Sequence, residues 1–143
     1  MNKNKVKGVT TELRVMSAFV ELGYSVSTPC GDCEQYDFIA DVNGKLLRVQ
    51  CKTAVSYDNG RSIDIDFRRK DWTAPGKSKH TYYDKERVDI AATYFKGKTY
   101  LVPAEEIIGK IRLRFDFPKT GQKSGFNMAS DYEIQKVIKR MEV

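Results

Sequence analysis

The 143-residue sequence predicts an α/β fold in which a central mixed β-sheet is flanked by helices. Three observations support this prediction: apolar residues at helical spacing early in the chain, a β-hairpin signal after them, and several short alternating segments typical of strands. No linker, repeat or low-complexity tract divides the chain, and its length suits one core. We therefore expect a single domain over residues 1–143.

The first expected element is a helix over residues 8–23, with Thr10 or Thr11 as its N-cap. Glu12 precedes the apolar stripe of this helix by three and four residues, so its side chain should face inward. A lone buried carboxylate is costly, so such an acid must be paired, bound to a metal or placed at the edge of the stripe. The alternative is that Glu12 lies near the start of the helix only because the positive end of the helix dipole stabilises an acidic side chain there. The stripe consists of Val15, Met16, Phe19, Leu22 and Tyr24.

The next elements are strands expected near residues 25–28, 35–42 and 45–54. Asn43-Gly44 favours a two-residue type I′ turn, which sets the register of the two strands that it joins. If Val42 lies opposite Lys45, counting back along both strands places Asp37 opposite Gln50.

Side chains alternate along a strand, so Lys52 should project from the same face as Gln50, whereas Cys51 should point into the core with Val49 and Leu47. Three polar side chains then converge: Asp37, Gln50 and Lys52.

The remaining elements are predicted from the same side-chain spacings, about 3.6 residues per turn for helices and alternation for strands. Strands are expected near residues 61–67, 87–95, 98–102 and 111–115. A short helix is expected from Pro103 to about Lys110, and another over residues 129–141. The segment from Asp71 to His80 contains Pro75-Gly76 and few apolar residues, so we expect a loop that is mobile until a bound partner orders it.

Glu12, Asp37, Gln50 and Lys52 together resemble the active-site residues of the PD-(D/E)XK nuclease superfamily. Its members carry a Glu on an N-terminal helix, followed by a hairpin that holds an Asp and an E-x-K or Q-x-K. Tyr36 stands where Pro often precedes the Asp, and Gln50 replaces the more common Glu. The Gln resembles the branch that contains group I intron homing endonucleases, and later segments resemble its trailing strands and closing segment: 82–83, 88–90, 100–103 and 127–133.

The resemblance implies a restriction-endonuclease-like core and a site-specific, metal-dependent endonuclease that hydrolyses double-stranded DNA. Mg²⁺, which Mn²⁺ should be able to replace, would bind to Asp37, the Gln50 side chain and the backbone carbonyl of Cys51, with Glu12 reaching it directly or through water. Lys52 would position the attacking water or help to deprotonate it. The resemblance implies no small-molecule organic cofactor.

Because one active centre cuts one strand, the resemblance also implies a homo-oligomer, either a dimer or a tetramer. Two other functions stay open: a nuclease that resolves four-way DNA junctions, and a non-catalytic DNA-binding module with a decayed site. Cleavage of duplex, junction and single-stranded DNA would distinguish these three.

The charge balance agrees with a polyanionic partner, since 25 Lys and Arg residues stand against 19 acidic ones, with a net charge of +6 and a pI near 9.2. Basic residues gather before the first helix, after the strand at 61–67 and in the loop beside aromatic residues. For each group a merely solvated face is an equal alternative. The candidate DNA-binding residues are Lys5, Lys7, Arg68, Arg69, Lys70, Lys77, Lys79 and His80.

Cys30 and Cys33 form a C-x2-C pair that suggests zinc or redox chemistry. A structural zinc site needs four ligands, and only the inward Cys51 and the distant His80 remain, so we expect a turn without cysteine chemistry. The odd cysteine count and the absence of a signal-peptide pattern predict an intracellular, cytoplasmic protein that associates with the nucleoid when bound to DNA. No apolar run is long enough to cross a membrane.

Overall fold

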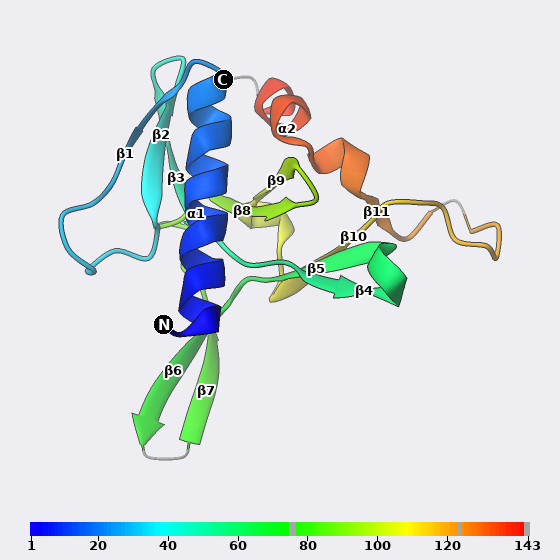
Figure 1. Ribbon diagram of the computed structural model, residues 1–143, viewed down its shortest axis with the longest axis horizontal. Helices are drawn as coiled ribbons and strands as arrows, with labels where there is room; N and C mark the ends of the chain where they lie inside the picture. Colours follow the sequence, from blue (N-terminus) through cyan, green and yellow to red (C-terminus); the bar gives the residue numbers. More distant parts are fainter. Residues whose placement is uncertain (75–76, 123, 142–143) are drawn as a thin grey trace.

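The computed structural model describes residues 1–74, 77–122 and 124–141, and the side chains of these residues outside 69–82 (Figure 1). In chain order, the helices, strands and 3-10 turns (η) are α1 (Lys3–Glu21), β1 (Ser25–Ser27), β2 (Phe38–Val42), β3 (Lys45–Cys51), β4 (Val55–Tyr57), η1 (Asp58–Gly60), β5 (Ser62–Asp66), β6 (Arg68–Ala74), β7 (Lys77–Tyr82), β8 (Ile90–Phe95), β9 (Lys98–Pro103), η2 (Ala104–Glu106), β10 (Lys110–Arg114), β11 (Asn127–Met128), η3 (Ala129–Tyr132) and α2 (Ile134–Arg140).

The central sheet has the strand order β1-β2-β3-β8-β9. The β3–β8 pair is parallel and the other pairs are antiparallel, so the predicted mixed sheet is confirmed. Helix α1 lies against this sheet (Figure 1). Val15 and Phe19 are fully buried, and the Phe19 ring meets the Phe38 ring of β2 edge to face, with the centroids 5.7 Å apart. The apolar stripe of α1 is therefore what attaches the helix to the sheet.

A second sheet has the order β11-β10-β5-β4, and its separation from the first was not predicted. The strand predicted over residues 45–54 ends early, at Cys51 in the central sheet, and β4 begins only at Val55 and pairs with β5. The alternation of β5 and β10 buries their apolar residues: Ile63, Ile65, Ile111 and Leu113. On the opposite face, Arg112 forms an ion pair with Asp64, with Nε 2.7 Å from Oδ1.

The prediction of a loop from Asp71 to His80 is wrong, because β6 and β7 form an antiparallel hairpin that extends away from both sheets (Figure 1). Its register places Arg68 opposite Tyr82 and Lys70 opposite His80. Backbone N–H and C=O groups pair in such a ladder whatever the side chains are, so a polar composition did not prevent strand formation.

Helix α1 begins at Lys3, five residues before the predicted start at residue 8. Its N-cap is Asn2, whose Oδ1 accepts hydrogen bonds from the backbone N–H groups of Asn4 (3.0 Å) and Lys5 (3.4 Å). The capping role predicted for Thr10 or Thr11 is therefore wrong. The Thr10 hydroxyl donates to the Val6 carbonyl within the helix, at 2.7 Å.

The helix predicted from Pro103 to Lys110 is also wrong. Pro103 ends β9, only the 3-10 turn η2 follows, and Lys110 already belongs to β10. The helix predicted over residues 129–141 is divided by Glu133, which has an extended backbone and pairs with Tyr100 of β9. In the described part of the chain, neither α1 nor α2 is long and apolar enough to span a membrane.

Candidate active site

The predicted register of the β2–β3 hairpin is confirmed, with Val42 opposite Lys45 and Phe38 opposite Val49. Asn43 and Gly44 have φ angles of 55° and 90°, as a type I′ turn requires. The Asp37 backbone N–H donates to the Val49 carbonyl at 2.8 Å, so the pairing continues past the start of β2. Asp37 thus lies at the end of β3 that carries Gln50, but its backbone N–H pairs with Val49 and not with Gln50, the residue predicted to lie directly opposite it.

Asp37, Gln50 and Lys52 are each half-buried and lie at this end of the hairpin. Asp37 Oδ2 accepts a hydrogen bond from the Cys51 backbone N–H at 2.7 Å. The Gln50 Nε2 atom donates to the Tyr83 hydroxyl at 3.1 Å and to the Cys51 carbonyl at 3.4 Å. The Lys52 ammonium nitrogen is 4.7 Å from the centroid of the Tyr83 ring.

Glu12 joins these residues from α1, where it is half-buried. Burial, and then the negative charge of Asp37, raise the pKa of Glu12 above its ordinary value. Burial also raises the pKa of Asp37, although the Cys51 N–H and the Lys52 charge act in the opposite direction. The structure therefore brings all four predicted residues together, and the two carboxylates repel each other electrostatically.

Cys51 packs against the core as predicted, beside the buried Val49 and Leu47. Burial, and then the negative charges of Asp37 and Glu12, raise the pKa of its thiol well above the ordinary value. The thiol is thus kept neutral. Cys51 contributes to this site through its backbone: the N–H donates to Asp37 Oδ2, and the carbonyl accepts from Gln50 Nε2.

The donor set fits a hard divalent cation. Among the described residues, no group of three or more His, Cys, Asp and Glu side chains is placed to hold a metal ion. The candidate ligands are instead the carboxylates of Glu12 and Asp37, the amide oxygen of Gln50 and the backbone carbonyl of Cys51, and Mg²⁺ prefers such oxygen ligands. A cation between the two carboxylates would also offset the repulsion from Asp37, which adds to burial in raising the pKa of Glu12.

Tyr83 was not predicted as a site residue, although it contacts both Gln50 and Lys52. The only sequence signal was the aromatic pair Tyr82-Tyr83 beside basic residues. The contact with Gln50 joins residues 33 positions apart, so no local spacing could have indicated it.

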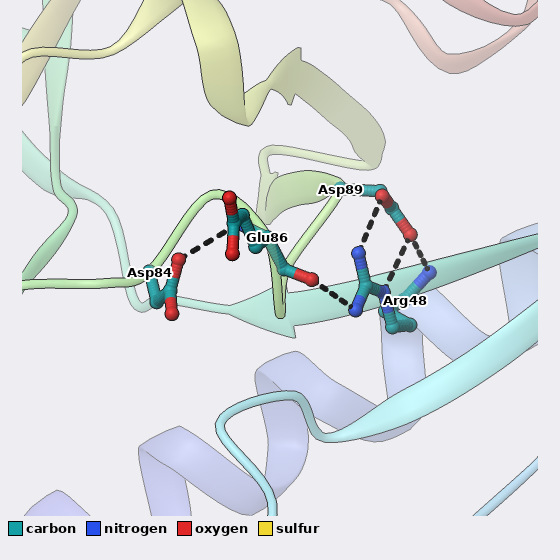
Figure 2. A network of polar contacts seen from close by, with 4 residues as sticks. All are labelled: Arg48, Asp84, Glu86 and Asp89. Atoms are coloured by element: carbon teal, nitrogen blue, oxygen red, sulfur yellow. Dashed lines mark hydrogen bonds and ion pairs between the residues drawn. The ribbon is translucent and has the colours of Figure 1, made fainter.

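A polar network holds the segment that follows Tyr83 against β3 (Figure 2). Arg48 donates from Nε to Asp89 Oδ2 and from Nη2 to Asp89 Oδ1, both at 3.0 Å, and from Nη1 to the Glu86 carbonyl. The Arg48 backbone N–H also donates to Asp89 Oδ2, at 2.8 Å. Within the segment, the Glu86 N–H donates to Asp84 Oδ1 at 2.9 Å. The network attaches residues 84–89 to the strand that carries Gln50.

The candidate DNA-binding residues have different positions. Lys5 and Lys7 are exposed on the first turns of α1, so the prediction that they precede the helix is wrong. Arg68 forms an ion pair with Asp66, with Nη2 2.7 Å from Oδ2. The side chains of the other five lie outside those that the structure describes: Arg69, Lys70, Lys77, Lys79 and His80.

Cys30 and Cys33 are free and exposed. Gly31 between them has a φ of 86°, a turn conformation that favours glycine. The pair thus lies at a bend between β1 and β2 and does not open a helix.

A protein-family model described as PD-(D/E)XK endonuclease matches residues 2–135. The solved structure of a bacterial homing endonuclease, I-Ssp6803I, has the same fold, with a TM-score of 0.77 and 22% sequence identity. The match covers 99% of this chain and 97% of that one. No curated protein sequence is similar enough to this chain to count as a match.

Proposed function

Because the chain belongs to the PD-(D/E)XK endonuclease family, we propose that it is a metal-dependent endonuclease that hydrolyses double-stranded DNA at specific sites, as homing endonucleases do. The observation that carries the proposal is the convergence of four side chains from one helix and one hairpin: Glu12, Asp37, Gln50 and Lys52.

Each of these residues has a role that its surroundings support. Glu12, Asp37, the Gln50 amide oxygen and the Cys51 carbonyl would hold Mg²⁺, or Mn²⁺ in its place. A divalent ion bound there supplies a Lewis acid that offsets the negative charge developing on the scissile phosphate. Lys52, whose charge acts on Asp37, would position the attacking water and take part in its deprotonation.

The homing type and the assembly state are parts of the same proposal. The full-length similarity in fold to a bacterial homing endonuclease supports the homing type. We propose a dimer or tetramer, since a double-strand break needs two active centres and one chain supplies one. Sedimentation of the free and DNA-bound protein measures this, and a monomer in both states would contradict it. We also propose that the enzyme acts inside the cell, where it would meet genomic DNA.

Cleavage of a randomised plasmid library with and without Mg²⁺ tests the function, because no target sequence has to be assumed. We expect Mg²⁺-dependent double-strand cuts at a recurring sequence. Linear duplex, four-way junctions and single-stranded DNA would be compared in parallel. Cleavage confined to four-way junctions would identify a resolvase instead, and binding without cleavage would identify a non-catalytic module.

A further inference from the structure

Tyr83 lies between the two polar side chains of the Q-x-K pair and contacts both. Its hydroxyl accepts a hydrogen bond from Gln50 Nε2 at 3.1 Å, and its ring lies below the Lys52 ammonium, 4.7 Å from nitrogen to centroid. Both contacts are within ordinary limits for a hydrogen bond and a cation–π interaction. One side chain outside the predicted four residues therefore contacts two of them.

Tyr83 is itself held in place from two directions. Its ring stacks on the buried Phe67, with the centroids 4.7 Å apart and the planes at 15°. The next residue, Asp84, donates its backbone N–H to the Gln35 side chain at 3.0 Å, and the following segment is attached to Arg48 of β3 through Asp89. The ring and the chain on its C-terminal side are thus fixed before any ligand arrives.

The hydrogen bond with Tyr83 matters because an amide side chain has two different ends. A cation is attracted by the Gln50 oxygen and repelled by the hydrogens of its NH₂ group, and the two ends exchange when the amide turns over. With Nε2 donating to Tyr83 and to the Cys51 carbonyl, Oε1 is left as the ligand atom. A Glu at this position would have no such requirement, since its two oxygens are equivalent.

We propose that Tyr83 is a positioning residue for the metal site: its hydroxyl orients the Gln50 amide so that the oxygen faces the divalent ion, while its ring supports the Lys52 ammonium. This role rests on the proposed function, because it assumes that Gln50 is a metal ligand. It explains how a neutral amide serves at a position where related enzymes carry a carboxylate.

The test is the affinity for Mn²⁺, measured by electron paramagnetic resonance without DNA, in wild type and Tyr83→Phe. The Phe variant keeps the ring on Phe67 and below Lys52 and removes only the hydroxyl. We expect its Mn²⁺ dissociation constant to rise about 10-fold, as for other groups that orient a metal ligand. The melting temperature without metal should stay close to that of wild type.

A matched control is Tyr94→Phe, which also removes a hydroxyl that accepts one side-chain hydrogen bond, from Arg14 at 3.4 Å. Its Mn²⁺ affinity should equal that of wild type. The decisive measurement is a double-mutant cycle with Gln50→Glu. Because a carboxylate has no wrong end, Tyr83→Phe should change the Mn²⁺ affinity of the Gln50→Glu variant by less than about 2-fold.

The outcomes separate this role from the proposed function. Equal Mn²⁺ affinities of wild type and Tyr83→Phe would overturn the role of Tyr83 even if both proteins cut DNA. An equal loss of affinity in the wild-type and Gln50→Glu backgrounds would also overturn it, since the effect would then not depend on the amide. Mn²⁺ binding that depends on Tyr83 in a wild type that cuts no DNA would support the role and contradict the proposed function. A wild type that binds no Mn²⁺ would overturn both.

Discussion

The network around Arg48 should make a measurable contribution to stability, and Arg48→Met tests it. Methionine keeps most of the aliphatic side chain and removes the guanidinium, with its bonds to both Asp89 oxygens and to the Glu86 carbonyl. Asp89 keeps only the backbone N–H of residue 48 among these donors. The loss is therefore three charge-assisted hydrogen bonds, at the point where residues 84–89 meet β3.

The expected magnitude follows from the exposure of the pair. Hydrogen bonds to charged groups contribute roughly 1.5–3 kcal/mol each when buried, whereas exposed ion pairs contribute about 0–1 kcal/mol. The Arg48 and Asp89 side chains are each 31% exposed, so most of this is screened. We expect the free energy of unfolding to fall by about 2 kcal/mol in total. For a chain of this length, that corresponds to a melting temperature lower by about 6 °C.

The pH dependence gives a second measurement. Burial alone would raise the pKa of Asp89, but the hydrogen bonds from the Arg48 side chain and backbone, together with its charge, lower it below the ordinary value. An acid with a lowered pKa stabilises the fold above its ordinary pKa, and this contribution is lost as the pH falls through the lowered value. The difference between wild type and Arg48→Met should therefore be full near pH 7 and shrink below about pH 4.

Urea denaturation at several pH values measures both quantities. Arg87→Met is the matched control, because its ion pair with Asp84 is 4.0 Å long and both side chains are exposed. Its effect should be under about 0.5 kcal/mol. A loss under about 0.5 kcal/mol for Arg48→Met at pH 7 would refute the reasoning, as would a loss that does not decrease in acid.

Three further predictions concern the site. Lys52→Ala should reduce DNA cleavage by about 10²- to 10⁴-fold and leave duplex affinity in a gel-shift assay unchanged. The control is Lys45→Ala, at an exposed position of the same hairpin, which should cut normally. Undiminished cleavage by Lys52→Ala would remove the catalytic role of Lys52. Without metal, Asp37→Asn should be more stable than wild type at pH 8. The pKa of Asp37 is raised, so its ionised form destabilises the fold as the pH rises through that raised pKa. The Asn side chain can still accept the hydrogen bond from the Cys51 N–H. Saturating Mg²⁺, at about 100 times its dissociation constant, should stabilise wild type by about 2.7 kcal/mol and the variant by much less, as a thermal melt would show; equal gains would exclude Asp37 as a ligand. Removal of metal by EDTA should stop cleavage, and either Mg²⁺ or Mn²⁺ should restore it; cleavage that persists in EDTA would contradict metal dependence.

Local rules predicted the hairpin and the three site residues that it carries. Asn43-Gly44 sets the register, and alternation along β3 then separates Gln50 from the inward Cys51. The position of Glu12 followed from helical spacing, although the predicted helix began too late. The missed start has a local cause, since Asn2 caps a first turn in which Lys3, Lys5 and Lys7 leave Val6 as the single apolar residue.

Local rules failed where the outcome depended on what each segment packs against. The division of residues 45–57 between two sheets depends on which strands cover them, and no period within that segment indicates it. The β6–β7 hairpin is polar, so its strands carry none of the apolar alternation by which strands are predicted. The 3-10 turn after Pro103 replaced the predicted helix because the chain enters β10 at Lys110.

The sequence by itself therefore determined the α/β class, the mixed central sheet and the identity of the four converging side chains. These follow from the side-chain periodicity of helices and strands and from one turn. Only the tertiary structure decided how these side chains are supported. Tyr83 reaches Gln50 across 33 residues, and Asp89 reaches Arg48 across 41. Such contacts form because distant segments are packed together, and side-chain periodicity carries no information about that distance.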